Sequence, residues 1–180
     1  MANPKSAYSI PTKKGKLDTH ILVVWVDNEA GVLARVVGLF SGRGYNIESL
    51  AVAEVDATKN ISRITIVTTG TPQVIDQIKL QLKKLVPVHK VADFKREDKN
   101  VIFKEMALFK LVGNISKRKK AFNACKKYNA VLLDKTNKSY VVQVTALRRE
   151  IDIMSKNLKK LGLVSVSRTG AAVSYTHLTL

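Results

Sequence analysis

The chain contains the stretch Asp27-Asn28-Glu29-Ala30-Gly31-Val32-Leu33-Ala34-Arg35, which directly follows the apolar run 21–26. A buried strand that ends at this point and leads into an amphipathic helix leaves the first N–H groups of the helix without internal partners. Those donors and the positive end of the helix dipole suit a small carboxylate. Gly31 has no side chain to hold such a ligand away from the backbone. Because the repeated glycines of a dinucleotide or triphosphate cradle are missing, the stretch predicts an anion-binding strand–turn–helix of another kind.

The residues around this stretch, 20–94, show the order β-α-β-β-α-β. The apolar spacing alternates between strand-like runs and helical faces. Gly42 and Gly44 supply a stop for the first helix, and Thr71 followed by Pro72 predicts a capped start for the second. The expected elements are a strand over 21–26, a helix with its apolar face over 32–40, strands over 46–55 and 61–69, a helix from Pro72 that Pro87 ends, and a strand over 88–94.

The same order returns, less cleanly, in the second half of the chain. We expect strands over 105–112, 130–134, 139–146 and 163–167, a helix over 115–128 with Phe122 and Cys125 inward, and a helical stripe over 147–161 that Gly162 stops. The sequence therefore predicts an α+β fold of two tandem βαββαβ units. The expected organisation is a basic flexible extension over 1–19, domains over 20–94 and 105–172 joined by a linker over 95–104, and a tail over 173–180. Because residues 174–180 extend no pattern, they are interpreted either as a frayed terminus or as foreign sequence.

Composition narrows the class of protein. The chain has 180 residues, 46% of them hydrophobic, which is enough for one domain or two small ones with packed cores. It has one cysteine, no apolar signal segment and no run long enough to span a bilayer, so we expect a cytoplasmic protein without membrane contact. Residues 95–180 carry 19 basic and 6 acidic side chains, whereas residues 20–94 carry 8 and 7. The second half is thus strongly cationic, and its partners are expected to be acidic.

No residues assemble into a catalytic or metal site in the sequence. The three histidines, His20, His89 and His177, lack the spacing of metal ligands, and Cys125 falls on the apolar stripe of a helix without a histidine base. Glu48 and Glu54 are interpreted as solvated or interface charges rather than as an acid–base pair. We therefore expect a non-catalytic protein with no metal site.

The sequence resembles the small regulatory subunit of acetolactate (acetohydroxyacid) synthase. The resemblance is dense over 20–94 and thinner over 105–172, where Arg168-Thr169-Gly170 matches the closing motif of the family. It is carried by Ile21-Leu22-Val23-Val24, by the continuous stretch from Asp27 to Leu50, by Leu50-Ala51-Val52-Ala53-Glu54, by Ser62-Arg63-Ile64-Thr65-Ile66-Val67, by the segment 77–85, and by Val86-Pro87-Val88-His89-Lys90-Val91.

This resemblance implies two ferredoxin-like units, an N-terminal ACT domain and a smaller ACT-like C-terminal domain. It further implies a homodimer through the ACT domains, which binds valine, or leucine or isoleucine, where two ACT domains meet. Such a subunit activates the large catalytic subunit and confers feedback inhibition in branched-chain amino acid biosynthesis. The joining of two pyruvates with loss of carbon dioxide belongs to that partner. Thiamine diphosphate, Mg and FAD are accordingly expected only on the catalytic subunit, and no cofactor is expected in this chain.

The resemblance also implies an effector site, carried over position by position. The turn and helix start supply one side, and the beginning of the second strand supplies the other side across the dimer. Val32 and its apolar neighbours are expected to receive an isopropyl group. Ala34 and Ala51 stand where many relatives have Ser or Thr, so hydroxyl contacts are missing and a lower affinity is expected. The effector-binding residues are Asn28, Ala30, Gly31, Val32, Leu33, Ala34, Asn46, Ile47 and Ala51.

Other interpretations remain open at the level of the sequence. Asn28 can be a turn or cap residue alone, with Gly31 a steric necessity. The chain can also be a free-standing ACT-domain amino-acid sensor with a different enzyme partner. A basic RNA-binding protein is less favoured, because Phe109 and Tyr140 are isolated and the paired aromatics that stack bases are missing. The lysine-rich stretch 117–120 is interpreted as a solvated helix face rather than as an acidic-partner interface.

Overall fold

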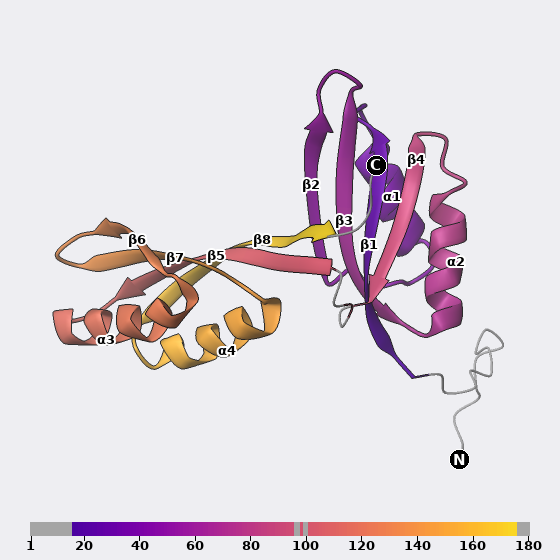
Figure 1. Ribbon diagram of the computed structural model, residues 1–180. Helices are drawn as coiled ribbons and strands as arrows, with labels where there is room; N and C mark the ends of the chain where they lie inside the picture. Colours follow the sequence, from indigo (N-terminus) through magenta and orange to yellow (C-terminus); the bar gives the residue numbers. More distant parts are fainter. Residues whose placement is uncertain (1–15, 96–97, 99–100, 176–180) are drawn as a thin grey trace, which may run out of the picture.

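The computed structural model describes residues 16–95, 98 and 101–175 (Figure 1). They form two four-stranded antiparallel sheets, each with two helices on one face. The predicted tandem of βαββαβ units is therefore confirmed. Within the described ranges, no helix combines the length and hydropathy needed to cross a bilayer. Most of the predicted extension, residues 1–15, and most of the predicted tail, residues 176–180, lie outside the described residues.

The first unit follows the predicted order of elements. Its sheet has the order β2-β3-β1-β4, and its core lies between that sheet and the two helices. Thr71 accepts a hydrogen bond from the Val74 N–H and Pro72 opens the second helix, as predicted. The elements are β1 Asp18–Asp27, α1 Val32–Ser41, β2 Ser49–Asp56, β3 Ile61–Gly70, α2 Pro72–Leu82 and β4 Val88–Lys95.

The second unit repeats this architecture with the sheet order β6-β7-β5-β8. Phe109, Tyr140 and Cys125 lie in its core, the cysteine fully buried. Burial raises the pKa of the Cys125 thiol to about 11, which leaves it protonated and inert at neutral pH. The elements are β5 Val101–Val112, α3 Ile115–Cys125, a 3₁₀ turn η1 Lys126–Tyr128, β6 Val131–Lys135, β7 Ser139–Ala146, α4 Arg148–Lys159 and β8 Leu163–Tyr175.

Five predicted boundaries were wrong. The helix that begins at Pro72 ends at Leu82, before the turn that contains Pro87. The strand predicted over 46–55 begins at Ser49, and the helix predicted over 115–128 changes at residue 126 into a 3₁₀ turn. The strand predicted to begin at Glu105 starts at Val101, within the predicted linker. The strand predicted over 163–167 continues to Tyr175, so residues 174 and 175 extend a pattern after all.

The two lengthened strands, β5 and β8, join the units. They pair with each other as far as Val101 and Tyr175 and extend from the second sheet to the helix-free face of the first sheet (Figure 1). Their ends form a third apolar cluster with β1, β3 and β4. Its buried members are Ile21, Val23, Val67, Phe94, Val101 and Val173. β1 is therefore covered on both faces, as its uninterrupted apolar run predicts.

One residue of the lysine-rich stretch is not solvated. Lys117, Lys119 and Lys120 are exposed, but the side chain of Arg118 is buried, with 1% of the residue accessible. Its guanidinium donates to the carbonyl oxygens of Thr136 (2.7 Å) and of residue 137 (2.8 Å), and lies over the Tyr140 ring at 4.7 Å. Interpreting the whole stretch as a solvated face was thus wrong at this position, where a buried arginine holds the β6–β7 turn.

A charged network fastens β8 to the body of the second unit. Arg168 donates to both carboxylate oxygens of Glu105, at 2.5 and 2.7 Å, and to Asp152 at 2.6 Å. These bonds, that to Glu105 above all, raise the pKa of Arg168. Glu105 is only 6% exposed, so the guanidinium compensates a carboxylate that has lost most of its water.

Replacing Arg168 with methionine is expected to lower the free energy of unfolding by about 2–3 kcal/mol, because Glu105 then stays buried without its partner. Urea unfolding of the full chain measures this change. The double variant Glu105→Gln with Arg168→Met serves as the control and should regain part of the loss, since no buried charge remains. Equal stability of Arg168→Met and the parent chain would contradict the role of this network.

Candidate functional site: the open start of α1

A turn joins β1 to α1 at residues 28–31, where the sequence predicts a strand–turn–helix. Gly31 occupies the N-cap position with φ 85° and ψ −9°, a left-handed conformation that favours glycine. A Cβ built at this residue meets nothing within 4 Å, so the space in front of the helix is open. The first helical hydrogen bond runs from the Arg35 N–H to the Gly31 carbonyl at 3.0 Å. The N–H groups of Leu33 and Ala34 precede that bond and point toward this space.

Among the four α-helices of the described chain, α1 alone begins without a side-chain partner. Thr71 caps α2 and Asn114 caps α3, while Glu150 accepts the Leu147 N–H at the start of α4. α1 has no side-chain cap and no acidic residue in its first turn. No side chain therefore caps the first N–H groups of α1, and this supports the predicted preference for a carboxylate.

Asn28 holds the turn together without capping the helix. Its backbone N–H donates to the Asn60 carbonyl (2.7 Å), and the Asn60 side chain donates to the Asn28 carbonyl (3.2 Å). The Asn28 side-chain amide donates to Glu54 of β2 at 3.3 Å. The interpretation of Asn28 as a turn residue is thus right and its interpretation as a cap is wrong. The bond to Glu54 ties the turn to β2.

The helix period separates the predicted site residues on α1 into two groups. Val32 is 3% exposed and packs in the first core, so its side chain does not face the open end of the helix. Leu33 is 40% exposed, and residues 30 and 34 are also exposed. An aliphatic group arriving at this surface would meet Leu33, rather than Val32 as predicted.

The remaining predicted residues lie elsewhere within the chain. Asn46 and Ile47 precede β2, close to the Gly70 end of β3, where Thr68 donates to the Asn46 carbonyl at 2.7 Å. The turn at Asn28 lies at the opposite end, because residue 27 of β1 pairs with residue 61 of β3. About eight strand residues, more than about 20 Å, separate the two ends. One chain alone therefore does not bring Asn46 and Ile47 to the start of α1.

Ala51 lies at a third place, beneath β8. A Cβ built on Gly170 would come within 3.5 Å of the Ala51 Cβ and 2.8 Å of the Ser49 Oγ. A cleft of about 140 Å³ opens beside them, lined by residues 51–53, Arg63, Thr65 and 169–172. Arg148 of α4 also approaches Glu48, at 3.8 Å. Sequence reasoning did not foresee this contact between the units, and the only signal for it was the glycine in Arg168-Thr169-Gly170.

The residues considered for catalysis are engaged in structural contacts. His20 is buried and bonded to Asp93 at 2.7 Å, and His89 contacts Asp27 at 2.6 Å. Glu48 accepts a hydrogen bond from Thr69. Over residues 16–95, 98 and 101–175, no three His, Cys, Asp or Glu side chains are grouped as metal ligands would be. His177 lies outside the described residues.

The aromatic residues considered for RNA stacking are inaccessible. Phe109 is 0% exposed and Tyr140 is 4% exposed, both within the second core. A base cannot stack on either ring without unfolding the sheet. The positive charge of the second unit alone supports only nonspecific, salt-sensitive association with nucleic acid.

Comparison with known proteins follows the division into two units. Residues 22–90 match the family model of the AHAS small subunit-like ACT domain, and residues 104–173 match that of the small subunit of acetolactate synthase. The acetolactate synthase small subunit of Buchnera aphidicola is 36% identical over 156 residues, which are 86% of this chain and 96% of that protein. That of Haemophilus influenzae is 38% identical over 157 residues, covering 82% of this chain and 94% of the relative.

Solved structures agree with the sequence comparison. The crystal structure of the small subunit from Thermotoga maritima superposes with a TM-score of 0.80 at 27% identity, covering 89% of this chain and 99% of that one. The two matched ranges span most of both sheets, the start of α1 and the closing Arg168-Thr169-Gly170 of this chain. The chain belongs to the acetolactate synthase small-subunit family.

Proposed function

We propose that this chain is the regulatory subunit of an acetolactate synthase: it activates a separate catalytic subunit and makes that subunit sensitive to valine. The observation that carries the proposal beyond family membership is the uncapped start of α1, with Gly31 open in front of it. An amino-acid carboxylate satisfies the free N–H groups and the helix dipole at once. The exposed Leu33 next to them gives an aliphatic side chain an apolar contact.

The chemistry belongs to the partner in this proposal. The catalytic subunit would hold thiamine diphosphate, Mg and FAD and would join two pyruvates with loss of carbon dioxide. This chain would supply binding and regulation alone. The proposal assigns the complex to the cytoplasm, which suits a chain whose single cysteine is a buried thiol.

The effector site is completed by a second copy of the chain in this proposal. β2 is an edge strand, paired only with β3 in its sheet, and carries exposed Val52 (44%) and Val55 (47%). Antiparallel pairing of two β2 strands about a two-fold axis would satisfy these edges and cover the valines. The same symmetry brings the turn at Asn28 of one protomer toward residues 46–47 of the partner subunit. The separation of the two groups within one chain thus favours a shared site.

Replacing Val52 with lysine is expected to convert the dimer to a monomer at micromolar concentration. Val52 lies at the middle of β2, so two like charges would meet near the two-fold axis without water. Light scattering during gel filtration, over a range of concentrations, measures this change. Val86→Lys is the matched control: Val86 is 96% exposed in the turn after α2, and its charge should leave the dimer intact. A parent chain that is monomeric under these conditions would contradict the shared site.

Reconstitution tests the regulatory role. The full chain is mixed with the catalytic subunit of the same organism, and acetolactate formation is followed with and without valine, leucine and isoleucine. We expect the rate to rise on mixing and to fall again as valine is added. If the chain neither activates that enzyme nor renders it sensitive, yet binds valine in calorimetry, the free-standing sensor is the correct function. Loss of both properties would reject the proposal altogether.

A further inference from the structure

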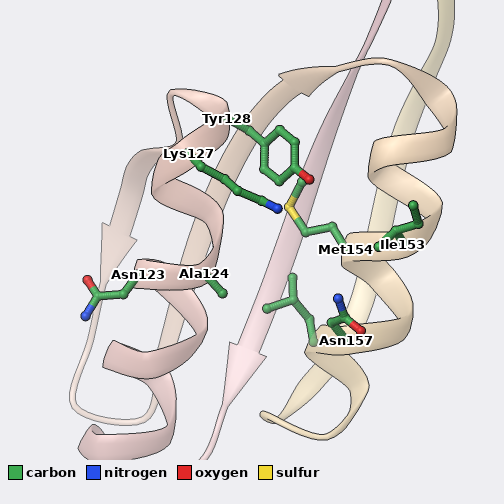
Figure 2. A pocket seen from close by; sticks show the side chains of 8 residues that line it. Asn123, Ala124, Lys127, Tyr128, Ile153, Met154 and Asn157 are labelled. Carbon is green, nitrogen blue, oxygen red and sulfur yellow. The ribbon is translucent and has the colours of Figure 1, made fainter.

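A second cavity lies in the other unit, between the end of α3 and the middle of α4 (Figure 2). Its volume is about 330 Å³, within the range that holds small organic molecules. The helix α3 ends at Cys125, and the chain turns through η1 to Asn129, which has a left-handed conformation with φ 52°. Ala124 lies on the side of α3 that faces α4, and its methyl group is too small to fill the space between the two helices (Figure 2).

The lining of this cavity has an apolar side and a polar end. Met154 and Leu158 of α4 are buried in the second core and form the floor, and Ile153 beside them is 55% exposed. Lys127 and Tyr128 reach from the end of α3 toward Met154, whereas the Asn123 side chain turns away from α4 (Figure 2). Asn157 adds an amide from α4. An apolar body lying on the floor would therefore have a cation and two uncharged polar groups at its edge.

The charge around the cavity selects an anion. Its lining contains one cation, Lys127, and no carboxylate. The hydrogen bond with Tyr128 raises the pKa of Lys127, so the ammonium stays charged at neutral pH. Glu150, the acidic residue that acts on it, already accepts the Leu147 N–H at 2.9 Å. Exposed lysines on both helices and directly after them add to the positive field, namely Lys117, Lys119, Lys120, Lys126, Lys156, Lys159 and Lys160.

We propose that the α3–α4 cavity is a binding site for a small organic anion with an apolar body. The anionic group lies at Lys127 with the Tyr128 hydroxyl and the Asn157 amide. The apolar body lies between the exposed side chains of Ala124 and Ile153, next to the largely buried Met154. This site is separate from the start of α1 and would hold its anion through the Lys127 side chain, since it offers no helix N-terminus. It gives the second unit a ligand of its own.

Methionine methyl groups make the test specific, because the chain contains only Met1, Met106 and Met154. The full chain, labelled with ¹³C at these methyls and saturated with valine, is titrated with 4-phenylbutyrate and, separately, with phenyl phosphate. We expect at least one of the two probes to shift the Met154 signal saturably while Met106, on β5, stays in place. The probe that binds tighter tells whether the anion is a carboxylate or a phosphate. The neutral 4-phenylbutyramide should bind about fivefold more weakly than the carboxylate probe.

Two lysine variants distinguish binding in the cavity from nonspecific attraction of an anion to the lysine-rich surface. Lys127→Gln should weaken binding about fivefold. The matched Lys119→Gln, on α3 and outside the cavity lining, should change it less than twofold. Ala124→Leu fills the cavity and should abolish the Met154 shift. Failure of both probes to saturate, or equal effects of Lys127→Gln and Lys119→Gln, would overturn the proposal. Because valine is bound in the other unit, inhibition by valine would survive that failure.

Discussion

Replacing Gly31 with aspartate is expected to raise the valine concentration for half-inhibition of the reconstituted enzyme more than about tenfold, which corresponds to about 1.4 kcal/mol of binding free energy. The new carboxylate would lie at the start of α1, where it satisfies the free N–H groups itself and repels the carboxylate of the effector. Activation should persist, because a side chain at this residue meets nothing within 4 Å. Rates at saturating pyruvate over a valine series measure both properties.

Gly31→Asn is the matched control for this variant. Asparagine has nearly the shape of aspartate and tolerates the left-handed conformation at φ 85° about as well, but it carries no charge. It should therefore reduce valine sensitivity much less than aspartate does. Equal losses in the two variants would assign the effect to shape or strain. Undiminished inhibition in Gly31→Asp would show that the effector binds elsewhere.

Replacing Gly162 with alanine is expected to cost at least about 3 kcal/mol of unfolding free energy and to lower Tm by about 6–12 °C. Gly162 follows α4 with φ 96°, and its carbonyl accepts the Val112 N–H at 2.8 Å. A Cβ there would come within 2.0 Å of the Val112 carbonyl oxygen, a backbone atom that cannot move without shifting β5. Thermal and urea unfolding of the full chain measure the loss.

Gly38→Ala provides the opposite control for Gly162→Ala. Gly38 lies inside α1, is exposed, and has open space around its missing Cβ. Alanine should therefore stabilise the chain by about 0.5–1 kcal/mol, through the helix propensity and the smaller backbone entropy of the unfolded state. A Gly162→Ala chain as stable as the parent would contradict the close approach of this turn to β5.

The first unit could be predicted from the sequence because its local signals agree with its tertiary packing. Thr71 and Pro72 favour the N-cap and first position of a helix through local geometry, and the apolar run of β1 indicates burial on both faces. In the second unit the local signals are weaker. The extension of β5 to Val101 and of β8 to Val173 depends on apolar partners in the first sheet, and such partners are invisible to a local pattern.

The candidate site was predicted in part, for a similar reason. The end of the strand at Asp27-Asn28 and the start of a helix after Gly31 follow from local residue types, and the structure has both. The left-handed conformation of Gly31 was not predicted. The helical period, applied strictly, would have turned Val32 inward and Leu33 outward. No sequence pattern could tell that Ala51 faces β8 or that Asn46 lies at the far end of the sheet, since both facts depend on strand register.

The cluster that Ile21, Val23 and Val67 form with Val101 and Val173 has a consequence for how the molecule can be divided. Separating the two units would expose the apolar residues of this cluster to water. The free-energy cost is roughly 25 cal/mol for every Å² of apolar surface exposed. Each unit alone would have an exposed apolar surface and would therefore tend to self-associate. Melting of one half thus removes support from the other, so the intact polypeptide unfolds as a single cooperative body.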